Sequence, residues 1–265
     1  MKKQTDQDSH INRIFSLLDC FSAQQPELGV REAARLLGIS SSASGRLLAA
    51  LRNEGVLIQN PESRSYSLGG RVLRWAGTYT ATSDLNVHAL PYMKKILNET
   101  NETVSLYVVE GNERVCVERL ESRQNVRIVE MVGQRLKLYA GSGGRAILAF
   151  MEKSEIERIL QIAATEIDPQ NAAEEIDQIR TQLQTVRQTG YAISHGEWLT
   201  EASGIASPIL NDKGNPIGSV SISGPSQRFQ DESKLKEYAD LLLKYMQKIS
   251  SDLGFVSDNL TIPSK

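Results

Sequence analysis

The sequence predicts an α+β protein in which a small helical N-terminal domain precedes a larger domain built on an antiparallel sheet. Up to about residue 82 the apolar residues recur at helical spacing, whereas from Thr103 they alternate with polar ones, as in strands. Two late strands, 204–210 and 216–223, are separated by a strong turn signal at 211–215. At 265 residues the chain is also long enough for two domains, each with its own core.

The composition is typical of a globular protein, with 40% hydrophobic and 23% charged residues. No apolar run approaches the length of a membrane span, and the start of the chain lacks the apolar core of a signal peptide. We therefore expect a cytoplasmic protein with no membrane partner. Cys20 and Cys116 lie far apart, each within an apolar pattern, so reduced buried thiols are expected rather than a disulfide.

Charge is divided unevenly along the chain, although the net charge is only −2. Residues 1–82 carry 10 Lys and Arg against 7 Asp and Glu, whereas the remaining residues carry 20 against 25. A mildly basic N-terminal region on an acidic body is compatible with nucleic acid binding at one end. The weak net charge argues against a protein that coats nucleic acid nonspecifically.

Residues 30–51 predict two helices joined by a tight turn. Gly38 can take the left-handed conformation that ends the first helix, and Ser40 can cap the second by accepting a backbone N–H bond. An apolar stripe of the second helix faces the core. Small polar and basic residues surround its first turns, namely Ser41, Ser42, Ser44, Gly45 and Arg46.

This pattern is typical of a helix-turn-helix, whose second helix lies in the DNA major groove with its N-terminal residues near base edges. Ser41, Ser42 and Ser44 would allow close approach. Arg46 can reach a phosphate or a guanine edge. The alternative is an ordinary helical hairpin with a solvated polar face.

The flanking segments agree with DNA binding. A helix predicted over 10–22 would pack beneath the pair, and residues 1–9 are expected to fray. The inward residues of that helix would be Ile11, Ile14, Phe15, Leu18 and Phe21. Residues 56–70 predict a β-hairpin, which directly after the second helix forms the wing of a winged helix-turn-helix. Arg64, near its tip, can reach a phosphate or the minor groove.

A helix over 71–82 has the length and position of a linker, and the next helix, over 86–98, is expected to break or restart at Pro91. The alternative assigns both helices to the core of one domain. An antiparallel hairpin of strands 103–109 and 114–120 follows. A third strand is predicted over 126–132, helices over 144–151, 153–163, 172–189 and 231–253, and a loose tail over 255–265.

Gly141, Ser142, Gly143 and Gly144 lead into one of these helices. Exposed N–H groups and the positive end of a helix dipole make such a turn a cradle for a carboxylate. A plain structural turn is an equal alternative. The segment is not a phosphate loop, because the Gly-Lys-Ser/Thr ending is missing.

Ser221 and Ser223 lie two apart on a predicted strand, so both hydroxyls face one side, which is either a pocket or solvent. His195 and Glu197 form a lone His-x-Glu pair. A metal site needs three or four converging ligands, and only two other histidines exist, so no metal or cofactor is expected. No Ser-His-Asp order or nucleophile elbow can be assembled, which disfavours an enzyme, such as a small-acid-processing one with a helical accessory domain.

Five blocks of the sequence together resemble the IclR family of bacterial transcriptional regulators. They are LLGISSSASGRLLAAL at 36–51, YSLG at 66–69, ETVSL at 102–106, AGSGGRAILA at 140–149, and the run from 190 to 225. Each block is weak alone, whereas their order and spacing are specific and cover nearly the whole chain.

The resemblance implies an N-terminal winged helix-turn-helix, a linker helix and a C-terminal effector domain similar to a GAF domain. We place these parts at 9–71, 72–85 and 86–258. Family members are usually dimers or tetramers that bind palindromic double-stranded operators. A small molecule, often an organic acid or an aromatic, changes their affinity for DNA. The expected protein is therefore a DNA-binding homo-oligomer controlled by an effector, and not an enzyme.

The resemblance also favours the pocket interpretation of the glycine-rich turn. It implies that Gly204 and Ile205 line the opposite wall, and that Glu197 keeps the acidic character of a family cluster. The expected effector residues are Gly141, Ser142, Gly143, Gly144, Glu197, Gly204, Ile205, Ser221 and Ser223. The expected DNA contacts are Ser41, Ser42, Ser44, Arg46 and Arg64.

Overall fold

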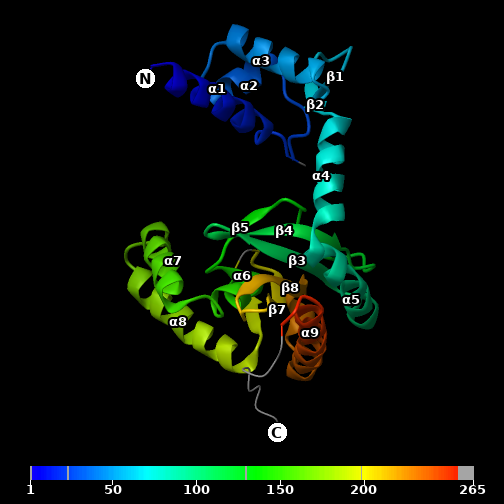
Figure 1. Ribbon diagram of the computed structural model, residues 1–265, viewed down its shortest axis with the longest axis vertical. Coiled ribbons are helices and arrows are strands. Elements are labelled where there is room, and N and C mark those ends of the chain that lie inside the picture. Colours follow the sequence, from blue (N-terminus) through cyan, green and yellow to red (C-terminus); the bar gives the residue numbers. More distant parts are fainter. Residues whose placement is uncertain (1, 23, 129, 198, 256–265) are drawn as a thin grey trace. The chain divides into compact units, whose positions relative to one another are not determined.

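The computed structural model describes residues 2–22, 24–128, 130–197 and 199–255, and the side chains of the first helix from residue 10 onward. The chain divides into two compact units, Met1–Thr82 and Ser83–Lys265, and each is described by itself (Figure 1). Helices dominate the first unit and an antiparallel sheet the second. The predicted α+β class is confirmed.

The N-terminal unit contains the predicted helix-turn-helix. Its elements are α1 (Lys2–Leu18), α2 (Val30–Leu37), α3 (Ser41–Asn53), β1 (Leu57–Gln59), β2 (Tyr66–Leu68) and α4 (Gly70–Thr82). Gly38 ends α2 in the left-handed conformation with φ of 64°, which costs a glycine little. The Ser40 hydroxyl accepts a hydrogen bond of 3.2 Å from the Ala43 N–H and caps α3.

The first helix is shifted from its prediction. Instead of spanning 10–22 it begins at Lys2 and ends at Leu18, and reciprocal backbone bonds between Ser22 and Gln25 close the turn after it. Its fully buried residue is Leu17, whereas Ile11 and Phe15 are exposed. The expected inward stripe was therefore partly wrong, because the face of α1 that packs on the core is rotated.

The predicted wing is confirmed. β1 and β2 pair antiparallel with Leu57 opposite Leu68, and Leu28 adds a short bridge through two 2.9 Å bonds with Tyr66. At the tip the Asn60 carboxamide oxygen accepts hydrogen bonds from the Glu62 and Ser63 N–H groups. This Asx-type turn fixes the reversal of the chain.

The C-terminal unit is a six-stranded antiparallel sheet in the order β5-β4-β3-β8-β7-β6. Its strands are β3 (Thr103–Glu110), β4 (Glu113–Leu120), β5 (Arg135–Lys137), β6 (Ala192–His195), β7 (Ala202–Leu210) and β8 (Pro216–Pro225). Its helices are α5 (Asp84–Thr100), α6 (Gly141–Leu148), α7 (Lys153–Glu166), α8 (Ala172–Thr189), the short 3-10 turn η1 (Ser226–Phe229) and α9 (Glu232–Asp252).

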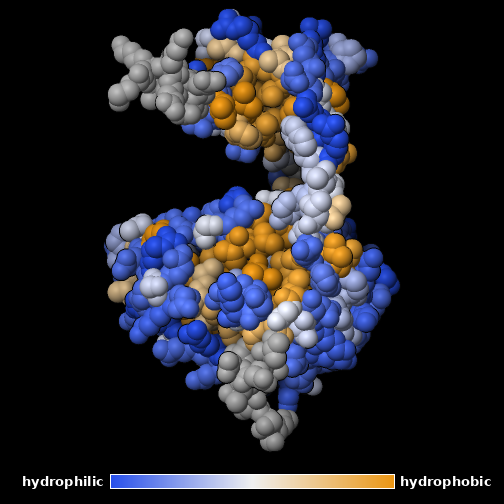
Figure 2. Space-filling view, viewed as in Figure 1, coloured by the Kyte–Doolittle hydropathy of each residue, from blue (hydrophilic) through white to orange (hydrophobic). Residues whose placement is uncertain are grey.

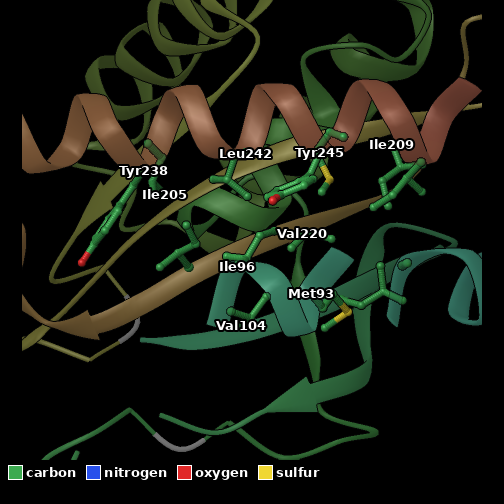
Figure 3. Packing of buried hydrophobic residues seen from close by; sticks show 14 of the residues in the cluster. Met93, Ile96, Val104, Ile205, Ile209, Val220, Tyr238, Leu242 and Tyr245 are labelled. Carbon is green, nitrogen blue, oxygen red and sulfur yellow. The ribbon is translucent and has the colours of Figure 1, made fainter. Parts of the chain in front are cut away.

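Helices cover both faces of this sheet, so the unit has two cores. One core joins the sheet to α5 and α9, and the other joins it to α6, α7 and α8 (Figures 1 and 3). Along β8 the residues alternate, with Val220 and Ile222 in the first core and Ser219 and Ser221 on the α6 side. The sheet therefore has one apolar face and one face with polar positions beneath α6.

The predicted third strand over 126–132 is wrong for its described residues, which are irregular. Side chains donate hydrogen bonds to the backbone carbonyls that would otherwise pair with a neighbouring strand. The Val126 carbonyl accepts from Arg228, and the Ile128 carbonyl accepts from Thr103 Oγ1. Backbone pairing with β4 resumes only at Gly133 and Gln134, and it leads into β5.

Two other elements differ from what the sequence predicts. α5 runs through Pro91 without a break. Proline has no N–H to donate to the Val87 carbonyl, but both residues lie on the solvent side of the helix, so the loss of this hydrogen bond is tolerated. The edge strand β6 had no predicted counterpart. Apart from residue 255, the predicted tail over 255–265 lies outside the described residues. In the described parts of the chain, no helix combines the length and hydrophobicity needed to cross a bilayer.

We predict that Gly218→Ala destabilises the C-terminal unit by about 3 kcal/mol, as severe overpacking does. A methyl group at this position would lie 2.3 Å from the Tyr107 carbonyl oxygen, and backbone in the middle of a sheet cannot move away. Urea unfolding monitored by circular dichroism measures the change. Gly77→Ala, in open space on α4, is the matched control and should not destabilise the protein.

Candidate functional site

Three of the five predicted DNA contacts lie together at the exposed start of α3 or one turn later. Ser41, Ser42 and Arg46 are exposed to solvent. Among the described residues Arg46 makes no ion pair or side-chain hydrogen bond. An exposed, uncommitted guanidinium at the N-terminal end of a recognition helix is available to a phosphate or a guanine edge.

Ser44 does not belong to this surface, and its prediction as a DNA contact is wrong. Its side chain is fully buried, and its hydroxyl donates a 3.1 Å hydrogen bond to the Val30 carbonyl at the start of α2. Gly45 also faces Val30, whose methyl group would lie 3.5 Å from an added Cβ. The Ser44 side chain therefore belongs to the packing of α3 on α2, and an added Cβ at position 45 would make an ordinary contact there.

Arg64 is exposed at the wing, where its backbone takes the left-handed conformation with φ of 59°. Its N–H donates to the Asn60 carbonyl, and its carbonyl accepts from the Gln59 carboxamide. Both backbone groups are thus held by the wing, while the guanidinium makes no hydrogen bond or ion pair with the described residues. The turn presents this charge at the tip of the hairpin.

In the C-terminal unit, a cavity of about 50 Å³ lies between the first turn of α6, the polar face of the sheet and the segment before β5. Seven of the nine predicted effector residues line it, namely Gly141, Ser142, Gly143, Glu197, Gly204, Ser221 and Ser223. Ser221 and Ser223 therefore face a pocket and not solvent. Figure 2 shows that hydrophobic residues gather on one face of this unit, with hydrophilic residues around them.

Two predicted effector residues do not reach the cavity. Ile205 is fully buried in the core against α9, since its neighbours Gly204 and Ala206 take the opposite face of β7 (Figure 3). Gly144 packs on backbone, because an added Cβ would lie 2.5 Å from the Leu138 carbonyl oxygen. Neither residue lines this cavity.

The glycine-rich turn is the first turn of α6 itself, with Ala140 before it. A Cβ on Gly143 would lie 2.9 Å from the Tyr107 ring, so the turn packs directly on β3. Ser219 of β8 donates a 2.9 Å hydrogen bond to the Gly143 carbonyl. These contacts hold α6 against the sheet and set the width of the cavity.

Glu197 occupies the anion-binding position that the sequence assigned to an effector. Its carboxylate accepts a 2.9 Å hydrogen bond from the Gly141 N–H at the start of α6. The same carboxylate forms a bidentate ion pair with the buried Arg145, which also donates to the Ile193 carbonyl. The positive end of α6 and the Arg145 charge are thus already neutralised within the protein.

Sequence reasoning missed three buried polar side chains on the cavity wall. Tyr107 donates a short hydrogen bond to Glu130 and accepts a 3.3 Å bond from Ser221. The Arg114 guanidinium lies 5.0 Å from the Tyr107 ring centroid and donates to the Lys137 and Ala140 carbonyls. One atom of each charged group, Arg114 Nε and Glu130 Oε1, is buried without a hydrogen-bond partner among the described residues.

Burial is the main influence on the pKa values of the polar side chains around the cavity. It raises the pKa of Glu130, although the Tyr107 hydrogen bond and the Arg114 charge partly oppose it. Burial also raises the pKa of Tyr107 far above its ordinary value, so the phenol stays protonated. The pKa of the Cys116 thiol rises to about 12 for the same reason, which leaves it an unreactive buried thiol.

The His195 imidazole contacts Ser203 Oγ at 3.0 Å, and Ser203 donates to Ser226 at 2.9 Å. Within the described ranges, no three His, Cys, Asp or Glu side chains converge as metal ligands would. The polar groups of the cavity are therefore suited to hydrogen bonding and to charge recognition.

We predict that the stability gap between the wild type and Glu130→Gln depends on pH. Because the pKa of Glu130 is raised above 4.5 by folding, the folded state holds this proton more tightly than the unfolded chain. The wild type should therefore lose stability relative to the variant as the pH rises from 4.5 through the folded pKa. Urea unfolding of both proteins from about pH 3 to about pH 8 measures the gap.

Glu121→Gln, in the same connecting segment, is the matched control of opposite sign. The Arg127 hydrogen bond and the Arg119 charge lower the pKa of Glu121, so its stabilising contribution is present above pH 4.5 and is lost as the pH falls through the folded pKa. A Glu130→Gln gap that stays flat across the range would contradict the burial of Glu130.

The chain matches two family models. The model described as the IclR helix-turn-helix domain covers residues 11–61, and the model for the C-terminal part of the bacterial transcriptional regulator IclR covers residues 77–251. Curated relatives include the transcriptional regulators KipR of Bacillus subtilis, 30% identical over 91% of this chain and 95% of its own, and KdgR of Escherichia coli, 27% identical over 96% of both.

Solved structures agree with these matches. The Thermotoga maritima IclR structure aligns with a TM-score of 0.73 at 25% identity over 93% of this chain and 99% of its own. An IclR homologue from Microbacterium hydrocarbonoxydans, solved in complex with 4-hydroxybenzoate, aligns with a TM-score of 0.76 at 24% identity over 92% and 98%. The curated relatives are regulators and not enzymes. The chain therefore belongs to the IclR family of bacterial transcriptional regulators.

Proposed function

We propose that this regulator reads an operator half-site with the exposed start of α3 and holds the DNA backbone with its wing. Ser41, Ser42 and Arg46 would face the major groove, and Arg64 a phosphate or the minor groove. The exposure of both arginines, and the lack of a partner for either within the described residues, support this assignment. A homodimer or homotetramer would present paired heads to a palindromic operator.

The same proposal assigns the C-terminal cavity to an effector that controls operator affinity. One observation carries this assignment: a cavity lined by hydroxyls, the glycine-rich start of α6 and buried charges lies between α6 and the sheet. The Microbacterium homologue holds 4-hydroxybenzoate, which supports an organic acid or aromatic as the class of effector. The α4 segment would act as the linker that carries the signal.

An effector changes operator affinity only through its different affinities for the two states of the regulator. Coupling of about 1–3 kcal/mol, or roughly 5- to 150-fold in DNA affinity, is the usual scale. That scale sets the sensitivity that a binding assay needs.

We predict that Arg46→Ala weakens operator binding about tenfold or more, because one arginine contact in the major groove contributes on the order of 1–3 kcal/mol. Electrophoretic shift of the intergenic DNA beside the protein's own gene measures the loss. Arg187→Ala, an exposed arginine on α8, is the matched control and should bind like the wild type. No shift by the wild type in dilute buffer, or an unchanged shift with Arg46→Ala, would refute the proposed contact.

We predict that a thermal-shift screen of organic and aromatic acids yields ligands whose affinity falls about tenfold when Ser221 and Ser223 are both changed to Ala. The two hydroxyls line the cavity, and Ser221 also bonds to Tyr107. Calorimetric titration of the best ligand measures the change. Ser251→Ala on α9 is the control, and equal binding by all three proteins would place the effector elsewhere.

A further inference from the structure

The charges around the cavity are not equivalent. Of the two buried arginines beside it, Arg145 is neutralised by the Glu197 carboxylate, with side-chain exposures of 4% and 31%. Glu197 also takes the Gly141 N–H at the start of α6. An anionic ligand would have to displace this internal carboxylate to bind there, so the α6 terminus is the less favourable place for it.

Arg114 is the other buried arginine, only 5% exposed. In the described part of the chain it forms no ion pair, and its hydrogen bonds go to two neutral carbonyls. Its Nε has no hydrogen-bond partner, and the side chain lines the cavity. A buried guanidinium is strongly stabilised by a carboxylate, so this side of the cavity favours an anionic group.

Glu130 requires a hydrogen-bond donor, whereas Arg114 favours an anionic group. It is 6% exposed and lines the same cavity. Its Oε2 accepts from Tyr107, whereas its Oε1 has no partner within the part of the chain that the structure describes. In its ionised form, at a pH above its raised pKa, the Glu130 carboxylate is an acceptor only, so Oε1 then requires a hydrogen-bond donor. Arg114 and Glu130 both contact the Tyr107 side chain, which brings the two requirements to one end of the cavity.

We propose that the effector is a short aliphatic hydroxy acid, with its carboxylate on Arg114 and its hydroxyl donating to Glu130. This inference rests on the proposed function, in which the cavity is the effector site. The cavity volume of about 50 Å³ has room for a few water-sized groups, so a short chain that reaches in from the open side fits it better than an aromatic ring does. Glu130 is the specificity-determining residue, since it separates a hydroxy acid from an oxo acid of the same size.

The test is calorimetric titration of the full-length protein with four probes of similar size. Lactate carries both groups, propionate lacks the hydroxyl, pyruvate replaces it with an acceptor, and lactamide lacks the charge. Lactate should bind about tenfold more tightly than each of the others, because each loses a buried polar contact. Equal binding of lactate and propionate, or tighter binding of pyruvate, would overturn the inference.

Glu130→Gln supplies the second readout. The glutamine oxygen can still accept from Tyr107, while its NH₂ group turns the second position from an acceptor into a donor. The preference should therefore shift from lactate toward pyruvate by about tenfold or more, with the melting temperature serving as a check of folding. Glu121→Gln should keep the wild-type preference, and an unchanged preference in Glu130→Gln would overturn the inference.

The two proposals fail in different ways. If lactate binds with the expected preference but leaves operator affinity unchanged, the chemistry assigned to the cavity stands and its role as the effector site fails. If an unrelated small molecule shifts operator affinity through Ser221 and Ser223 while lactate does not bind, the effector site stands and the hydroxy-acid inference is overturned.

Discussion

The closeness of α6 to the sheet is the constraint on which the C-terminal unit depends. No Cβ fits at Gly143 or Gly144 without meeting the Tyr107 ring or the Leu138 carbonyl. Glycine at these positions lets the helix start directly above β3, and Arg114 can then reach the carbonyls at 137 and 140 beside it. The polar cavity is the space left where this close contact ends.

The two faces of the sheet divide a structural role from the ligand-binding role that we propose. One face packs aliphatic and aromatic side chains against α5 and α9, which makes a dry core. The other face carries serines, Tyr107 and buried charges beneath α6. Because neighbouring residues of a strand take opposite faces, each strand contributes to both roles, and a change at Ile205 acts on stability while one at Gly204 acts on the cavity.

Local signals predicted most of the fold. Gly38, Ser40 and the wing turn specify their conformations through neighbouring residues, so the winged helix-turn-helix was confirmed. Long-range contacts decided the errors: Ser44 is buried by α2, and the strand expected at 126–132 loses its carbonyls to distant side chains. Arg114 and Glu130 were missed because their meeting depends on tertiary packing. The available signal was a charged residue at an inward-facing position of an apolar strand, because Arg114 lies two residues before the buried Cys116 and therefore faces the same side of the sheet.

The Arg145–Glu197 pair and the exposed arginines differ in how strongly dissolved salt screens their charges. This pair is sheltered, with the arginine almost wholly out of solvent, so mobile ions do little to screen it. Arg46 and Arg64 are exposed, and the DNA contacts that we propose for them would be screened beyond about 8 Å at physiological ionic strength. A rise in the ionic strength of the surroundings would therefore weaken the proposed DNA contacts of Arg46 and Arg64, while the Arg145–Glu197 ion pair beside the cavity would stay formed.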